Sequence, residues 1–142
     1  MASPAEEAST RLTTAAICGG STGWFAGVGK LIQDPDKQVV VCDTGGYKPN
    51  PKWLLNSPTI QVMVRGEPHQ YSAAYAKSKE VSDNLLGCDP FVTAGSNRWD
   101  GVNGIGDITY VGSDDSHRPI FSINFRITYE PTTSMSSARE SL

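Results

Sequence analysis

The fold of this chain is decided by residues 118–131, which read RPIFSINFRITYEP. Within this stretch every second residue from Phe121 to Tyr129 is large and apolar. The residues between them are Ser122, Asn124, Arg126 and Thr128. A period of two residues predicts a long β-strand with one buried and one polar face. Pro119 and Pro131 bracket the pattern, and since proline cannot donate to a strand ladder we expect them at the strand ends.

Outward from this strand, the sequence predicts two helices and further strands. Ser3 followed by Pro4 is typical of a helix start, and apolar residues between His69 and Leu86 recur at helical spacing. We expect helices over residues 5–18 and 69–86, strands over 38–43, 59–65 and 107–111, and a glycine-spaced strand or loop over 22–32. Turn-rich connections are expected over residues 44–57 and 88–106.

These elements together predict an α+β fold. We expect a mixed, largely antiparallel sheet of about five strands with two helices packed on one face. A chain of 142 residues suits one domain with a real core. We place that domain at residues 1–131 and expect residues 132–142, which are polar and rich in serine and threonine, to form a flexible tail.

Composition excludes several classes of protein. A net charge of -3 argues against a dedicated nucleic-acid binder, which carries a basic excess. The three cysteines form no CxxC pair, a pattern that favours reduced thiols over a disulfide framework or a zinc site. The chain has no secretory leader pattern, and no apolar run approaches the roughly 18 residues of a membrane span. We therefore expect a protein made in a cytoplasm, with no membrane partner.

Candidate catalytic and ligand-binding motifs are incomplete. The glycines and lysine of residues 27–30 lack the spacing of a phosphate-binding loop. Residues 114–117, DDSH, crowd two carboxylates beside an imidazole, but a polar hairpin tip is favoured because Asp and Ser bond their own backbone there. We predict no enzymatic activity, no catalytic or metal site and no cofactor, with a small enzyme or ligand-binding domain using Asp114, Asp115 and His117 as the alternative.

Two arginines and three aromatic residues are candidates for contacts with a partner. Arg65 ends a predicted strand and Arg118 begins the central one, where a forked guanidinium suits a carboxylate either within the fold or across a subunit boundary. Tyr47, Trp53 and Trp99 lie in the predicted loops, where they can anchor an interface or fold back on the core.

The order of several motifs resembles the tail terminator proteins of long-tailed, siphovirus-like bacteriophages, which are often labelled minor capsid proteins. The resemblance covers roughly residues 5–131. It is carried by TGGY at 44–47, SPTIQVMVRG at 57–66, LLG at 85–87, YVGSD at 110–114 and RPIFSINF at 118–125. Each motif is weak alone, and their order makes the resemblance specific.

The resemblance implies a structural protein of the virion. Such proteins form a homohexameric ring that caps the head-proximal end of the tail tube, stops tube polymerisation and joins the tail to the neck of the head. The implied partners are the major tail (tube) protein, a neck or head-completion protein, and double-stranded DNA that passes through the lumen without sequence recognition. The expected location is the virion tail, assembled in the bacterial host cytoplasm. A neck or head-completion protein, or a tail-tube subunit, is the alternative.

The resemblance brings no catalytic residues, so the candidate site is a set of contact surfaces. A ring needs heterologous contacts, in which different patches of each subunit meet. The polar face of the central strand is a candidate for the neighbouring subunit or the lumen. The candidate subunit or partner contacts are Tyr47, Trp53, Arg65, Trp99, Asp114, Arg118, Asn124 and Arg126.

Overall fold

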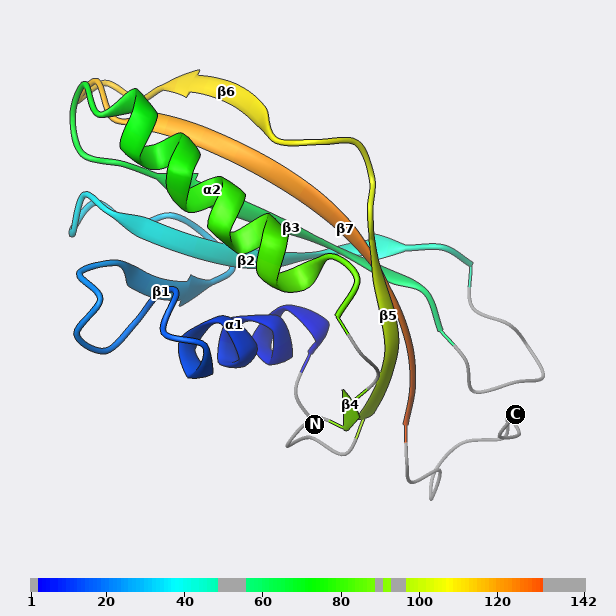
Figure 1. The fold of residues 1–142 in the computed structure, drawn as a ribbon. Helices are drawn as coiled ribbons and strands as arrows, with labels where there is room; N and C mark the ends of the chain where they lie inside the picture. Colours follow the sequence, from blue (N-terminus) through cyan, green and yellow to red (C-terminus); the bar gives the residue numbers. More distant parts are fainter. Residues whose placement is uncertain (1–2, 49–55, 89–90, 93–96, 132–142) are drawn as a thin grey trace.

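The computed structural model describes residues 3–48, 56–88, 91–92 and 97–131. This part of the chain forms two helices and one seven-stranded sheet (Figure 1). The helices are α1 (Pro4–Thr14) and α2 (Tyr71–Leu85). The strands are β1 (Phe25–Val28), β2 (Gln38–Gly46), β3 (Pro58–Arg65), β4 (Phe91–Val92), β5 (Asn97–Gly104), β6 (Thr109–Ser113) and β7 (Pro119–Pro131).

The first helix begins as its sequence predicts. The Ser3 side chain accepts a hydrogen bond from the backbone N–H of Glu6, and the Glu6 side chain accepts one from the backbone N–H of Ser3, which completes a capping box. Pro4 occupies the first turn, where its missing N–H costs nothing. The helix ends at Thr14, earlier than the predicted Cys18, and Ala16 beyond it has a left-handed φ of 58°.

The central strand of the sheet is β7, as its alternation predicts. The strand order is β1-β2-β3-β7-β5-β4, and β6 also pairs with β7. Only β1 and β2 are parallel, and every other pair is antiparallel. One side of β7 pairs with β3, while the other side pairs with β6 along its first half and with β5 along its second half. Pro119 and Pro131 are its end residues, as predicted.

Both helices cover the same face of the sheet, which confirms the predicted arrangement. Helix α1 packs on β1, β2 and β3, and α2 packs on β3 and β7. Their apolar side chains join a single core with those of the strands. Directly opposite residues in an antiparallel pair share a face, so Val62 and Ile123, and Ile60 and Phe125, lie together under the helices. The opposite face carries the polar residues of β7, and neither of the two helices in the described ranges covers it.

The segment 88–106 differs from its prediction as a turn-rich connection. It contains β4 and β5, and these two additional strands bring the sheet to seven strands rather than about five. A bulge at Asp100 shifts the alternation of β5, so that Trp99 and Val102 both point into the core. This shift hides the period of two residues that would have identified the strand.

Two other expectations fall partly or wholly outside the described residues. Strand β2 continues to Gly46, so the connection predicted from residue 44 begins later. Residues 49–55, which include Trp53, and the predicted tail at 132–142 lie outside the part of the chain that the structure describes.

Candidate functional site

Arg65 and Arg118 lie side by side at one end of the sheet and hold a loop of the same chain. The guanidinium of Arg65 donates to the carbonyl oxygens of Gln33 (3.3 Å), Pro35 (2.7 Å) and Asp36 (3.0 Å). That of Arg118 donates to the carbonyl oxygen of Gln33 (2.6 Å) and to the Oδ1 atom of Asp36 (3.1 Å). Both arginines are buried, so the pair fastens residues 33–36 to the sheet.

Asp114 supplies the main carboxylate of this network. Its Oδ2 atom accepts a hydrogen bond of 2.7 Å from Nε of Arg118 and lies 4.0 Å from Nη1 of Arg65. Its Oδ1 atom accepts from the backbone N–H groups of Ser116 and Arg118, both at 3.0 Å. The hairpin tip is therefore the self-bonded turn that the sequence favoured over a metal or catalytic site.

Electrostatics keeps this network charged. Burial alone would raise the pKa of Asp114, but hydrogen bonds from the backbone and side chain of Arg118 outweigh it and lower that pKa below its usual value. Burial opposes the charge of Arg118 too, but its bonds to Asp114 and Asp36 raise its pKa. Burial and the neighbouring Arg118 lower the pKa of Arg65. The sequence left two alternatives for these arginines, a carboxylate partner within the fold or one across a subunit boundary. The structure shows the partner within the fold.

The uncovered face of the sheet carries a different set of groups. Arg126 stacks on the ring of Tyr47 at 5.4 Å and forms no ion pair with the described residues. Thr59 lies opposite Arg126 on β3, and Gln61 lies opposite Asn124. This surface, which we call the open face, is rich in hydroxyl and amide groups. Its members include Thr59, Gln61, Asn103, Ser122, Asn124, Arg126 and Thr128.

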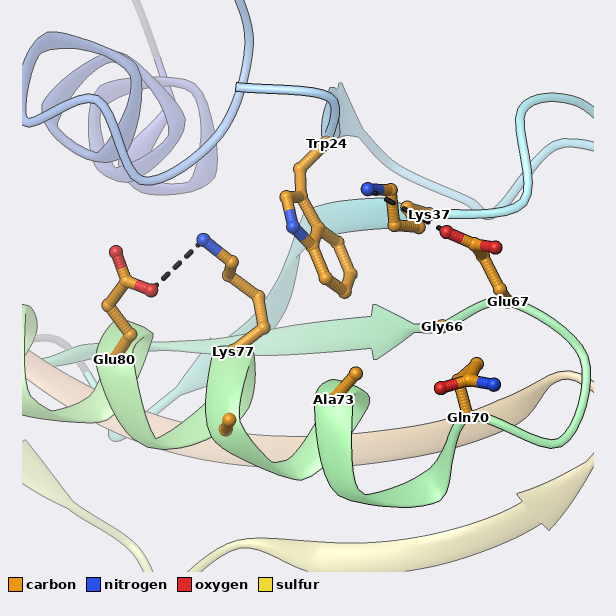
Figure 2. A pocket seen from close by; sticks show the side chains of 9 residues that line it. Trp24, Lys37, Gly66, Glu67, Gln70, Ala73, Lys77 and Glu80 are labelled. Carbon is orange, nitrogen blue, oxygen red and sulfur yellow. Dashed lines mark ion pairs between the residues drawn. The ribbon is translucent and has the colours of Figure 1, made fainter.

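A groove of about 380 Å³ lies between α2 and the segment before β1. Figure 2 shows the Trp24 side chain at its centre, with Lys37 and Lys77 on either side. The two Nζ atoms lie 5.5 Å and 5.3 Å from the ring centroid, distances that suit cation–π contacts. Each lysine also meets a carboxylate, Glu67 at 3.8 Å for Lys37 and Glu80 at 3.0 Å for Lys77. These charge pairs line the groove, and the contact of Lys77 with Trp24 holds α2 to the segment before β1.

The described residues assemble no catalytic or metal-binding constellation. They contain no cluster of three or more His, Cys, Asp or Glu side chains that could hold a metal ion. The rings of His69 and His117 stack on each other with centroids 5.1 Å apart. Burial raises the pKa of the thiols of Cys18 and Cys42, which disfavours the nucleophilic thiolate.

The structure separates the predicted contact residues into three places. Arg65, Asp114 and Arg118 meet in the network that fastens residues 33–36 to the sheet, which we call the arginine brace. Tyr47, Asn124 and Arg126 lie on or beside the open face. Trp99 is buried in the core, the second of its two alternatives, and we leave it out of any proposed interface.

The sequence does not reveal that the two arginines hold this loop, because residues 34–36 are predicted only as a turn. The buried Gln38 also holds this turn, because its amide nitrogen donates to the carbonyl oxygens of Ile32 and Pro35. An isolated Gln at the head of a valine run was the available signal.

No helix in the described parts of the chain is both long and apolar enough to pass through a membrane.

Comparison with known proteins identifies the family. No curated protein matches the sequence significantly. The family described as bacteriophage tail terminator protein matches residues 23–131, which span every strand of the sheet, helix α2 and the arginine brace. The match agrees with the resemblance carried by the motifs of β3, β6 and β7, and the chain belongs to the bacteriophage tail terminator family.

Proposed function

We propose that the protein forms a homohexameric ring that caps the head-proximal end of the phage tail tube. In that position the ring stops tube polymerisation and joins the tail to a neck or head-completion protein. Membership of the tail terminator family carries this proposal. The role is structural and non-enzymatic, and it places the protein in the virion tail after assembly in the host cytoplasm.

In the proposed ring, the open face lines the lumen through which double-stranded DNA passes. Each phosphate that a lysine or arginine neutralises adds affinity that does not depend on sequence, which would slow the passage of DNA. On the open face the guanidinium of Arg126 stacks on Tyr47, and that of Arg98 is paired with Asp100 and Glu130. Neutral groups such as those of Gln61 and Asn124 can touch a moving duplex without holding it.

Tyr47 supplies a contact with one of the two partners that adjoin the ring, the tube protein or the neck protein. It is 55% exposed and lies just beyond the end of β2, six positions before Trp53 in the sequence. Aromatic side chains with this exposure are frequent anchors of protein interfaces. We assign Tyr47 and Trp53 to the contact with the tube protein or the neck protein.

The test is an assembly experiment with the major tail protein present. Native mass spectrometry and negative-stain microscopy should find six copies of the chain in a ring at one end of each tube, and tubes should stop growing when the protein is added. A chain that remains monomeric and never binds tube ends would refute the proposal. Growth of the chain alone into long tubes would instead identify a tube subunit.

A further inference from the structure

The exposed large apolar side chains gather at two opposite edges of the sheet. Among the described residues, only Tyr47 lies apart from these two groups. The first group surrounds β1 and contains Phe25, Val28 and Ile32. The second surrounds β6 and the outer side of α2 and contains Tyr71, Tyr75, Leu86, Ile105, Tyr110 and Val111. We call them the β1 edge and the β6 edge. Figure 1 places β1 and β6 on opposite borders of the molecule.

The β1 edge is a strand border with a hollow beside it. Among the described residues, strand β1 pairs only with β2, and its other side has no strand partner there. Phe25 and Val28 are 37% and 47% exposed. A depression of about 410 Å³ adjoins the strand and is lined by Phe25, Ala26, Trp24 and three glycines of the preceding loop. Glycines leave this surface free of side chains, so another molecule's side chain can enter.

The β6 edge carries the exposed side chain of Val111 beside a cluster of packed aromatic rings. In the part of the chain that the structure describes, strand β6 pairs only with β7. Tyr71 packs edge-to-face against Tyr110 at 5.1 Å and against the buried Phe121 at 5.0 Å, and the ring of Tyr110 is tilted against that of Phe121 at 5.4 Å. Val111 occupies a bulge between Tyr110 and Gly112 and is 61% exposed. A bulge interrupts the strand ladder and makes continued main-chain pairing unfavourable, so contact here is made through side chains.

Charges beside the two edges are complementary. Lys30 follows β1, is exposed and forms no ion pair with the described residues. Asp107 precedes β6 and is also exposed, and its carboxylate accepts a hydrogen bond from the backbone N–H of Ile108. Asp115 is exposed at the far end of the same edge. Opposite charges that flank apolar patches favour one partner and one orientation.

We propose that the β1 edge of one copy packs against the β6 edge of the next copy, with Val111 seated in the hollow beside Phe25. The two surfaces differ, so the contact is heterologous and repeats around a closed ring. It also removes from water two apolar patches that a monomer would leave exposed. This inference rests on the proposed ring and names the surfaces that close it.

Cysteine cross-linking tests the contact directly. A Val28→Cys chain and a Val111→Cys chain are mixed on tube ends and treated with a short bis-maleimide. Mixed samples should give a covalent dimer of the two variants, while each variant alone and the unsubstituted protein, which carries Cys18, Cys42 and Cys88, should not. Cross-linking within a single variant would show that like edges meet and would overturn the proposal, as would absence of a mixed dimer from rings that have formed.

Assembly variants separate this inference from the proposed function. Val111→Asp should raise the concentration needed for ring formation by about tenfold or more, since it introduces an unpaired charge into the contact. Thr10→Asp, which adds the same charge to an exposed position of α1, should leave it unchanged. Lys30→Glu and Asp107→Lys should each weaken assembly, and their combination should restore it.

The outcomes are distinguishable because unsubstituted protein is measured in parallel. Failure of the unsubstituted chain to form rings or bind tube ends contradicts the proposed function. Normal ring formation by both the unsubstituted chain and Val111→Asp overturns only the edge contact. Equal melting temperatures of all variants establish that loss of rings is not loss of fold.

Discussion

Phe125 and Arg126 are neighbours in the sequence and lie on opposite faces of β7. Phe125 is completely buried beneath the helices, while Arg126 is half-buried on the open face with Tyr47 as its ring partner. Burial of apolar surface supplies the main free energy of folding, so the helix-covered face determines whether the domain forms. The open face contributes little to folding and is available for contact with other components. One strand thus separates, by alternation, the residues that stabilise the fold from those that we propose for contact with other components.

The largest difference between the two faces is expected when a side chain on the buried face is shortened. Phe125→Ala should lower the free energy of unfolding by about 3–5 kcal/mol, because it removes a buried ring and leaves a cavity. Urea unfolding monitored by circular dichroism measures the change. A loss below about 1 kcal/mol would mean that the helices do not pack on this face as described.

The arginine brace is an exception to the comparison, because Arg65 lies on the helix-free side and is nevertheless buried. Arg118→Met should cost about 2–3 kcal/mol of unfolding free energy, since it removes the buried guanidinium that donates to the carboxylate of Asp114 and to the carbonyl of Gln33. Urea midpoints measure the loss. Lys79→Met, which breaks the exposed pair with Asp83 at 3.2 Å, is the matched control and should not shift the midpoint.

A smaller effect is expected at the start of α1, which covers one end of the buried face. Ser3→Ala removes the capping box and should lower stability by about 1 kcal/mol. Thr10→Ala on the same helix is the control, and should be neutral or slightly stabilising because alanine has the higher helix propensity. Thermal melts of both variants give the comparison. Equal losses in both would show that the cap contributes nothing.

Acid should weaken the brace before it affects the apolar face. The folded-state pKa of Asp114 is lowered, so its contribution is complete above the unfolded pKa of about 3.9 and is lost as pH falls through the lower folded value. The stability difference between the unsubstituted chain and Asp114→Asn should therefore be constant from pH 7 to pH 5 and shrink below about pH 4. Urea titrations at pH 7, 5 and 3 test this. A difference independent of pH would contradict the charged brace.

The smallest effect is expected on the open face. Arg126→Gln should change unfolding free energy by no more than about 1 kcal/mol, the value of its contact with Tyr47. Urea unfolding of Arg126→Gln and Phe125→Ala in the same series compares the two losses of unfolding free energy. Their difference measures how unequally the two faces of β7 contribute to stability. A loss as large as that of Phe125→Ala would show that the open face is part of the core.

The sequence predicts those elements whose own pattern matches their environment. The alternation of β7, the Ser3 cap and the placement of both helices on one face follow from local rules and are confirmed. Strand β5 was missed because its residues, NRWDGVNG, are polar and its bulge breaks the alternation. Its strand conformation comes from pairing with β7, which is a tertiary effect.

The candidate site was harder to predict than the fold, because contacts across the chain decide it. Arg65 and Arg118 were found as a pair of interest, but their partners Gln33 and Asp36 come from a segment recognised only as a turn. Trp99 was expected in a loop, where exposure and burial were equally open. Its burial depends on the core that residues of α1, α2 and β7 form together, which no local pattern encodes.

The place of β7 in the chain also sets the order of events during synthesis. Strands β3, β5 and β6 all pair with β7, yet β7 begins only at Pro119 and is the last element made. Until it emerges, the residues of β3 have no partner on that side, β6 has no strand to join, and β5 has only the short strand β4. Long-range pairing of this kind is slow because the chain between the strands must be closed first. The sheet therefore cannot be completed before Pro131 has been made, and the β6 edge takes its final form only with β7 in place.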